Sequence, residues 1–440
     1  MDTAPRGVNL RAALSVAGAS MSLFCTVGFL NAFGVFQQHY KASNLQNMSE
    51  SDISWIGSIT IFLLYLAAPI TGLLVDNFGP RWLLLSGSLG MLLSVFMTSL
   101  CTQYYQFFLA QGVLQGISMS FITWPPIAVV SRSLPAHRGL ALGIVLSGSS
   151  VGGVIWPIML ARLLDHSSLG FGWVMRIVGF MMLPILIIAC CTVREPRQQL
   201  EQTTTPTTTI TTKSPAETGS ETELQVQTPI ESTPIAAAKR RVQKSEIMAL
   251  IKNPVFICLS LGLAMAFLGL FVPFFFISSY AIEIGIDPQM SFYLISIVNG
   301  ASLVGRVGPG HLADRFGHYN ICFLAAISSA ITAFCWTAAQ SLGGLVVISL
   351  AYGFTSGAIL AVQNACVAKI VGPHMQGTAM GLLMGCMALA SLGGGPIGGA
   401  LLTRYGYLSV SMYTGASLAA GSILIAAARF LLNKNLASPV

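Results

Sequence analysis

The chain reads Gly72-Leu73-Leu74-Val75-Asp76-Asn77-Phe78-Gly79-Pro80-Arg81, and further on it reads Gly310-His311-Leu312-Ala313-Asp314-Arg315-Phe316-Gly317-His318-Tyr319. The Gly, Asp, Phe and Gly of the first stretch recur in the second, each 238 positions later. The same offset relates three further residues to a matching set, namely Pro135, Gly139 and Gly143 to Pro373, Gly377 and Gly381. Distant segments that share one ungapped offset predict that the chain consists of two duplicated halves.

Both stretches lie between long apolar segments. The 440-residue chain is 54% hydrophobic and only 8% charged, with a mean hydropathy of +0.73, whereas soluble domains carry about 25% charged residues. A helix needs about 20 apolar residues to cross the hydrocarbon core, and in lipid it satisfies its own backbone hydrogen bonds. The sequence therefore predicts an all-α membrane protein with twelve transmembrane helices, six in each half.

The twelve predicted spans are Leu14–Phe36, Ile53–Val75, Trp82–Leu100, Tyr105–Val130, Leu140–Leu164, Val174–Val193, Val255–Tyr280, Ser291–Ala313, Ile321–Ala339, Gly344–Val367, Thr378–Leu402 and Leu408–Leu431. Their orientation follows from Lys and Arg, which are enriched in cytoplasmic loops. With both termini cytoplasmic, all but five of the 22 Lys and Arg residues fall in cytoplasmic segments. The net charge of +7 is thus explained by topology, and no nucleic-acid partner is expected.

The composition changes between the halves. From Arg194 to about Glu246 the chain is rich in Thr, Ser and Pro, which predicts a disordered linker. Basic residues and the apolar run Ile247–Ile251 then predict a short interfacial helix. The predicted organisation is a cytoplasmic N-terminus (1–13), an N-terminal six-helix bundle (14–193), the linker with its interfacial helix (194–253), a C-terminal six-helix bundle (254–432) and a cytoplasmic tail (433–440).

The duplicated pattern Gly-x-Leu-x-Asp-x-x-Gly-x-Arg, placed between the second and third spans and again between the eighth and ninth, resembles the signature of the major facilitator superfamily. The resemblance implies two pseudo-symmetric bundles around a central site, with alternating access by rocking. The glycines would let helices approach closely, and the Asp would bind an Arg or a helix N-terminus in one state only. The predicted gating residues are Gly72, Asp76, Gly79, Arg81, Arg138, Gly310, Asp314, Arg315 and Gly317.

Several strings are similar to the fungal branch of the monocarboxylate-transporter family, and this similarity spans the chain outside the linker. The strings are Ile53–Ser58, Gly79–Trp82, Gln111–Gly116, Arg138–Gly143 and Gly148–Gly153. Animal members carry a Lys and an Asp where this chain has Asn31 and Ser302, but their arginine of the eighth helix is present as Arg306. The resemblance therefore implies an anion-binding cation without its titratable partners, and it argues against proton-coupled lactate transport of the animal type.

Arg306 is the sharpest candidate for binding. It precedes Asp314 by eight positions, which places it about 12 Å deeper in the membrane at about 1.5 Å per residue. A charge at such depth costs at least about 2.5–3.5 kcal/mol, and no predicted membrane core holds a carboxylate to offset it. A permanently charged Arg can bind a substrate carboxylate bidentately. The alternative is an Arg that binds backbone carbonyls and holds the gate.

Polar and aromatic residues at similar depth complete the predicted substrate site. They are Asn299, Asn31, Trp124, Gln363, Asn364 and Phe275. The 238 offset places Pro125-Pro126 opposite Gln363-Asn364, and proline-bearing helices at matching depth indicate a binding site. As alternatives, the amides could hydrogen-bond neighbouring helices, and the rings could serve packing. Outside the spans, Asn47-Met48-Ser49 is a glycosylation sequon on a loop expected to be external.

Catalytic and metal-binding motifs are absent from the sequence, which lacks H-E-x-x-H and any metal-ligand spacing. No enzyme activity, cofactor or metal is therefore expected. The expected function is secondary transport of a small organic solute, anionic in character, with efflux of a metabolite favoured. Uptake of a monocarboxylate, another organic acid or a vitamin is one alternative, and a transporter-like sensor is another. The expected protein is a monomer in the plasma membrane or an internal membrane, with a proton as its candidate coupling ion.

Overall fold

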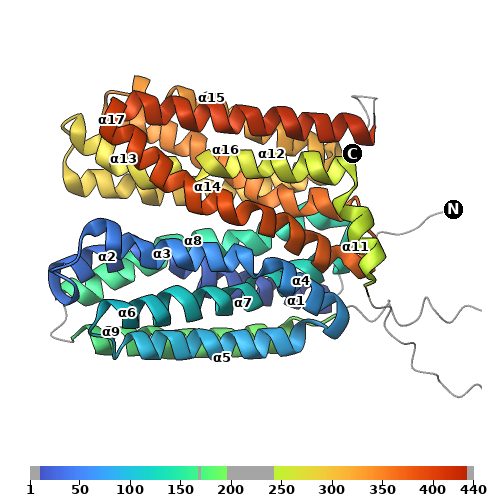
Figure 1. Ribbon diagram of the computed structural model, residues 1–440, viewed down its shortest axis with the longest axis horizontal. Coiled ribbons are helices and arrows are strands. Elements are labelled where there is room, and N and C mark those ends of the chain that lie inside the picture. Colours follow the sequence, from blue (N-terminus) through green and yellow to red (C-terminus); the bar gives the residue numbers. More distant parts are fainter. Residues whose placement is uncertain (1–9, 167–169, 196–241, 434–440) are drawn as a thin grey trace, which may run out of the picture.

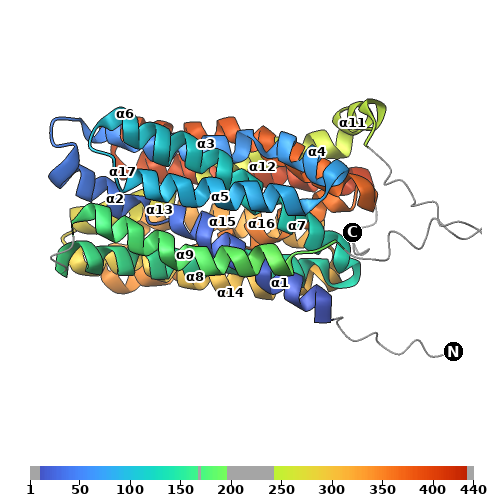
Figure 2. The ribbon, with the colours of Figure 1, turned by 90° about the horizontal axis from the view of Figure 1, so that it is seen from below.

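A computed structural model describes residues 10–166, 170–195 and 242–433. Within these ranges every regular element is a helix. Two helical bundles lie against each other: α1 to α9 (blue to green) form one, and α12 to α17 (yellow to red) form the other (Figure 1). We call them the N-half and the C-half. The view from below shows that the long helices of both run along the long axis of the molecule (Figure 2).

The helices of the N-half are α1 (Leu10–Leu23), α2 (Phe33–His39), α3 (Glu50–Leu66), α4 (Ala68–Phe78), α5 (Pro80–Thr98), α6 (Tyr104–Phe107), α7 (Gln115–Ser133), α8 (Arg138–His166) and α9 (Phe171–Thr192). π-Helical turns extend them at Phe24–Gly28, Tyr40–Asn44 and Phe108–Leu114. The short α11 (Lys244–Ile251) precedes the C-half, which consists of α12 (Pro254–Leu270), α13 (Val272–Glu283), α14 (Pro288–Phe316), α15 (His318–Phe334), α16 (Leu342–Ala368) and α17 (Gln376–Leu432).

Ten helical stretches of the described residues are long and apolar enough to cross a membrane. One of them, Pro373–Leu432, has 60 residues and is kinked at Gly406, where φ is 75°. Helix α14 is not one of the ten. Each of the twelve predicted spans overlaps a helix, although α1 begins at Leu10 rather than Leu14. The all-α membrane fold is therefore confirmed, whereas the number of twelve spans and their orientation stay predictions.

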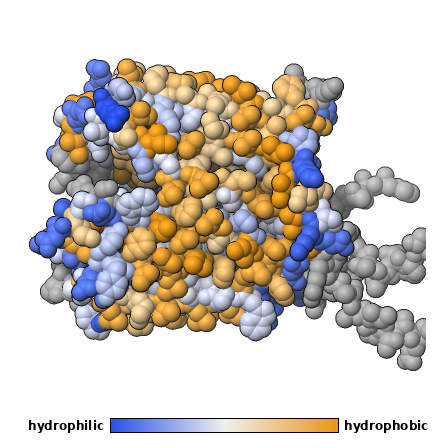
Figure 3. Space-filling view, viewed as in Figure 1, coloured by the Kyte–Doolittle hydropathy of each residue, from blue (hydrophilic) through white to orange (hydrophobic). Residues whose placement is uncertain are grey.

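Apolar side chains cover the sides of both halves, and hydrophilic ones gather at the two ends (Figure 3). Leu89 of α5 is 69% exposed, Val347 of α16 is 64% exposed, and Ile423 of α17 is 67% exposed. A surface band of this kind is stable when lipid rather than water surrounds it.

Two glycines of the repeated pattern reverse the chain. Gly79 between α4 and α5 has a φ of 84°, and Gly317 between α14 and α15 has a φ of 94°. L side chains rarely adopt this left-handed backbone, which explains why both copies carry Gly there. We call the end of the molecule at which these two turns lie the motif end, and the opposite end, at which Gly285 and Gly406 lie, the distal end.

Three breaks interrupt helices near the middle of the bundles. They lie at Asn31–Ala32 before α2, at Ala67 between α3 and α4, and at Phe271 between α12 and α13. Pro69 and Pro273 follow the last two breaks. Proline lacks the backbone N–H that would continue the helical hydrogen bonds, which explains the break before each of them. The offset of 238 carries Ala32 to the residue next to Phe271, so the first long helix of each half is broken at an equivalent depth.

The linker between the halves is described only at its two ends. Helix α11 occupies the stretch for which a short helix is expected. Disorder is predicted from Arg194 to about Glu246: residues 196–241 of this segment lie outside the described residues, whereas residues 244–246 belong to α11 and are helical.

Candidate functional site

Asp76, in the last turn of α4, joins the two halves at the motif end. Its carboxylate accepts hydrogen bonds from the backbone N–H groups of Gly377 (3.0 Å) and Thr378 (2.6 Å), and from the hydroxyl of Thr378 (2.8 Å), at the start of α17. Arg132 of α7 forms a salt bridge with it at 2.9 Å, and both side chains are at most 1% exposed. Free N–H groups and the dipole of a helix N-terminus stabilise a carboxylate, so this contact, the first clamp, holds α17 against the N-half.

Asp314, in the last turn of α14, makes the reciprocal contact. Its carboxylate accepts hydrogen bonds from the backbone N–H groups of Gly139 (2.6 Å) and Leu140 (2.9 Å) at the start of α8. The Nε2 atom of His318 lies 3.2 Å from the same carboxylate. This second clamp holds α8 against the C-half.

The offset seen in the sequence relates the two clamps. Adding 238 to Asp76 of the first clamp gives Asp314 of the second. Adding 238 to Gly139 and Leu140, the donors of the second clamp, gives Gly377 and Thr378, the donors of the first. The clamps differ in the basic side chain nearest the carboxylate, which is Arg132 in one and His318 in the other. Arg132 is missing from the predicted gating residues, because in the sequence it resembles any other cation of a cytoplasmic loop and the equivalent position holds Ile370.

Glycines let the backbones of the two halves touch beside each clamp. A Cβ on Gly310 of α14 would lie 2.5 Å from the carbonyl oxygen of Gly139. A Cβ on Gly72 of α4 would overlap the carbonyl oxygen of Gly377. These positions of the motif therefore serve close helix packing, as predicted for them.

The variant Gly310→Ala should lower the stability of the protein, since its Cβ has no room unless α8 and α14 separate. We expect a loss of about 1–3 kcal/mol, the usual range for overpacking, measured by thermal unfolding in detergent. Gly308 is a matched control on the same helix, because a Cβ there meets nothing within 4 Å. Gly308→Ala should leave stability unchanged or raise it by up to about 1 kcal/mol. Equal losses in the two variants would contradict this packing role.

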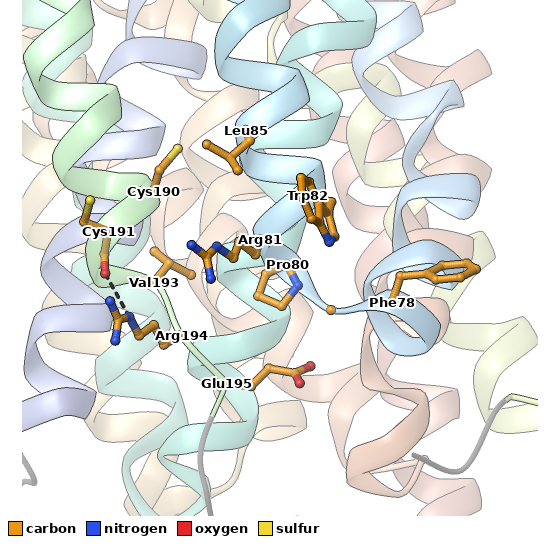
Figure 4. Close-up of a pocket in the computed structure, with 11 residues that line it drawn as sticks. Phe78, Pro80, Arg81, Trp82, Leu85, Cys190, Cys191, Val193, Arg194 and Glu195 are labelled. Carbon is orange, nitrogen blue, oxygen red and sulfur yellow. Dashed lines mark hydrogen bonds between the residues drawn. The ribbon is translucent and has the colours of Figure 1, made fainter. Parts of the chain in front are cut away.

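Within the described residues the predicted gating arginines form no salt bridge with the motif acids, although Arg138 interacts electrostatically with Asp314. Arg81 lines a surface pocket of about 520 Å³ between the start of α5 and the end of α9, together with Arg194 and Glu195 (Figure 4). Arg194 donates its Nε hydrogen to the carbonyl oxygen of Cys191 at 3.2 Å. The Glu195 carboxylate lies 3.6 Å from Arg132 and so extends the first clamp to the end of α9.

The two remaining arginines of the set differ in their surroundings. Arg138, in the first turn of α8, is buried and donates to the carbonyl oxygen of Ser131 at 3.2 Å. Arg315 of α14 is exposed to solvent. Of the two, Arg138 is therefore fixed within the motif end and Arg315 is not.

The end of the linker also contacts both halves. The backbone N–H of Val242 donates to the side-chain oxygen of Asn77, in the motif turn of the N-half, at 3.1 Å. On the other side, the Glu246 carboxylate lies 3.3 Å from Nε2 of His374, next to the start of α17. Residues 242–246 thus bridge the motif end outside the two clamps.

Arg306 lies deeper, in the contact between α14 and α8. Its Nη1 atom donates to the carbonyl oxygen of Leu146 at 2.5 Å and to the hydroxyl of Ser149. The residue is 6% exposed, and its Nε hydrogen has no partner among the described residues. The cation thus binds a backbone carbonyl of the other half, as the gating alternative required, and keeps one donor free. Ser149 is absent from the predicted site, although it lies within the string Gly148–Gly153.

Two of the predicted amides converge at the same interface. A Cβ on Gly153 of α8 would lie 2.7 Å from Nδ2 of Asn31 and 3.1 Å from Oδ1 of Asn299. Asn31 is exposed at the helix break, whereas Asn299 is 4% exposed and donates to the carbonyl oxygen of Ile295 at 3.1 Å. Spacings of three and four residues put Asn299, Ser302 and Arg306 on one face of α14, and this polar face meets α8.

The remaining predicted site residues lie elsewhere. Trp124 is buried and donates its indole N–H to the carbonyl oxygen of Leu64 at 3.0 Å. Gln363 and Asn364 are buried in α16, and both have side-chain atoms without a partner in the described part of the chain. Phe275 is 54% exposed and lies against Gly395. Within the described part of the chain, no hydrogen bond or ring contact joins Gln363, Asn364 or Phe275 to Arg306.

Two further expectations concern the loops and metal ions. Asn47 of the sequon is exposed in the turn before α3, and its glycosylation stays a prediction. No group of three or more His, Cys, Asp or Glu residues that could hold a metal ion occurs in 10–166, 170–195 and 242–433.

Comparison with known proteins identifies similar sequences along nearly the whole chain. The family model of the Major Facilitator Superfamily matches residues 12–382 and, separately, residues 310–439. An MFS-type transporter of Aspergillus fumigatus is 52% identical over 97% of this chain and 94% of its own length. The agnestins efflux protein of Paecilomyces divaricatus is 43% identical (97% and 89% covered), and the aspyridones efflux protein of Emericella nidulans is 35% identical (96% and 78% covered).

A solved structure has the same fold. The crystal structure of a human organic anion transporter superposes with a TM-score of 0.67, covering 94% of this chain and 99% of its own chain at 16% sequence identity. At this identity the similarity concerns the fold alone.

Proposed function

Because the chain belongs to the major facilitator superfamily, we propose that it is a secondary active transporter that exports an anionic organic metabolite by alternating access. The superfamily predicted from the duplicated motif is thereby confirmed, whereas the narrower resemblance to monocarboxylate transporters stays a prediction. Efflux is supported by the relatives whose names state it, the agnestins and aspyridones efflux proteins.

Arg306 is the observation that carries the anionic character of the substrate. It is a buried guanidinium between the two halves, it binds only neutral oxygens in the described structure, and it retains a free Nε hydrogen. A buried charge is costly unless an opposite charge joins it. An entering carboxylate or other anion would provide that charge, with Asn299 and Asn31 as neighbouring hydrogen-bond partners.

The clamps supply a mechanism for changing access. Both lie at the motif end, and both must break before α4 can part from α17 and α8 from α14. At the distal end a recess separates the halves in the space-filling view (Figure 3). We therefore assign this conformation to the state that is closed at the motif end, with the substrate site reached from the distal side.

The topology that we propose has twelve spans, with α14 as one span and the 60-residue stretch divided at Gly406 into two. The motif end is cytoplasmic, as the Lys and Arg distribution predicts, and the predicted domain boundaries and gating residues apply with Arg132 added. The transporter acts as a monomer in the plasma membrane, with a proton as its candidate coupling ion. Transport, not catalysis, is the activity that this family and site support.

Deletion of the gene should trap the exported compound inside the cell. We expect untargeted profiling to find at least one organic anion that rises in the cytosol and falls in the medium of the deletion strain, and expression of the intact chain should reverse the change. A compound that stays in the medium of the deletion strain would instead indicate uptake of an organic acid. Equal profiles under conditions in which the gene is expressed would favour the sensor.

A further inference from the structure

A chain of aromatic rings runs through the middle of the molecule. Trp124 of α7 contacts Tyr65 of α3, with ring centroids 5.6 Å apart. Tyr65 meets Phe267 of α12 edge to face, at 5.8 Å and an interplanar angle of 84°. The chain continues at 5.6 to 6.2 Å through Phe271 and Phe274 to Tyr352. We call these six residues the aromatic chain.

The contact between Tyr65 and Phe267 crosses from one half to the other. Every other ring pair found among the described residues lies within a single half, including the clusters around Tyr40 and Tyr280. The interface between the N-half and the C-half opens during transport, so rings that serve only packing need no partner across this interface. This single crossing therefore marks a position at which rings become free when the halves move.

Both rings of the crossing stand beside helix breaks. Tyr65 lies two residues before the break at Ala67, and Phe267 lies four residues before the break at Phe271. Broken helices near the middle of the membrane surround the substrate sites of many transporters. The crossing therefore lies where a substrate site is expected.

The aromatic chain is also close to the buried cation. Tyr65 of the N-half lies within electrostatic range of the Arg306 guanidinium of the C-half. Tyr65 and Trp124 are less than 10% exposed, while Phe271 and Phe274 are half-buried. The positive charge of Arg306 thus lies near the apolar rings of the aromatic chain.

We propose that the substrate is a planar aromatic anion, whose charge binds Arg306 and whose ring system enters between Tyr65 and Phe267. The proposal rests on the proposed function and specifies its substrate class. A ring held face to face between two others needs outer planes about 7 Å apart, because carbon atoms in contact lie about 3.5 Å apart. At present the two rings touch edge to face, with centroids 5.8 Å apart and an interplanar angle of 84°, so the substrate ring enters only when the halves separate and one ring turns parallel to the other. A saturated ring system is thicker and lacks the π-face, and it fits poorly.

Two carboxylic acids of the same carbon skeleton test this, using the purified full-length protein. The planar probe is 2-naphthoate and the saturated probe is decahydro-2-naphthoate, with binding measured by ligand-dependent shifts in thermal unfolding. We expect 2-naphthoate to bind at least about tenfold more tightly. Tyr65→Leu and Phe267→Leu should abolish this preference, and Tyr65→Phe, which keeps the ring, should retain it. Phe96→Leu, which removes a ring from a pair within the N-half, should also retain it.

The ratio of the binding affinities of the two acids shows whether the aromatic proposal or the anion site of the proposed function fails. Equal binding of both acids, with both lost in Arg306→Ala, would overturn the aromatic substrate class and leave the anion site standing. Unchanged binding in Arg306→Ala would instead refute the anion site of the proposed function. If neither acid shifts the unfolding of the intact protein at millimolar concentration, the aromatic proposal is also overturned.

Discussion

Replacing Arg306 by alanine is expected to reduce the export rate at least about 30-fold at subsaturating substrate. Truncating one partner of a buried, hydrogen-bonded charge pair costs about 2–5 kcal/mol, and the substrate anion would lose its only cation at this depth. Arg306→Lys should lose less, because it keeps the charge and gives up only the planar fork. Efflux of the compound identified by metabolite profiling, measured from preloaded cells, gives the rates.

Arg404 provides the control for this experiment. It is an exposed arginine near the distal end, so Arg404→Ala removes the same side chain without touching the interface between the halves. Its efflux rate should stay within about twofold of the unmodified protein, as for surface changes that alter stability by less than about 0.5 kcal/mol. A normal rate and a normal apparent affinity in Arg306→Ala would exclude Arg306 as the anion site.

The largest loss of stability is expected from Asp76→Asn. This change removes the carboxylate at 2.9 Å from the buried guanidinium of Arg132 and leaves only the more exposed Glu195 carboxylate at 3.6 Å, and Arg cannot lose its proton to escape the cost. Breaking a buried pair from one side destabilises by about 3–5 kcal/mol. Thermal unfolding of the purified protein measures the loss.

Asp314→Asn is the symmetry-matched comparison. Its carboxylate forms no salt bridge with an arginine among the described residues: His318 lies 3.2 Å away, and Arg138 interacts with it only at longer range. We expect a loss at least about 1 kcal/mol smaller than in Asp76→Asn. The double variant Asp76→Asn with Arg132→Gln should recover part of the stability lost by Asp76→Asn. A loss in Asp314→Asn that equals or exceeds that in Asp76→Asn would refute the unequal strengths of the two clamps.

The sequence predicted the features that depend on local pattern. Apolar length predicted the helices, and the repeated motif predicted the close packing at Gly72 and Gly310 as well as the role of Asp76 at a helix N-terminus. The offset of 238 relates the acceptor of one clamp to the acceptor of the other and the donors of one to the donors of the other, although only the structure shows that Asp76 binds the start of α17. Arg306 was recognisable because an arginine is rare within a membrane span.

Other contacts of the site could not be predicted from a sequence pattern. The partner of Arg306 includes the carbonyl oxygen of Leu146, and every residue has such an oxygen. Tyr65 and Phe267 lie in apolar runs in which an aromatic residue is unremarkable, and their contact joins positions about 200 residues apart in the chain. Phe275 stays a prediction, and the ring contact to Tyr352 is made by its neighbour Phe274. These features depend on how the halves meet, which periodicity does not encode.

Four of the donors in the two clamps are backbone N–H groups, and this has an evolutionary consequence. Any residue except proline supplies such a donor, so substitutions at 140 or 378 leave the backbone hydrogen bonds possible wherever the added atoms fit, whereas a Cβ at 139 or 377 would collide with the facing half. Two of the four backbone donors thus depend little on their side chains and the two glycines are fixed by packing, while the rings and amides around Arg306 are open to selection. Substitutions around Arg306 can therefore change the substrate during evolution while the two clamps stay unchanged.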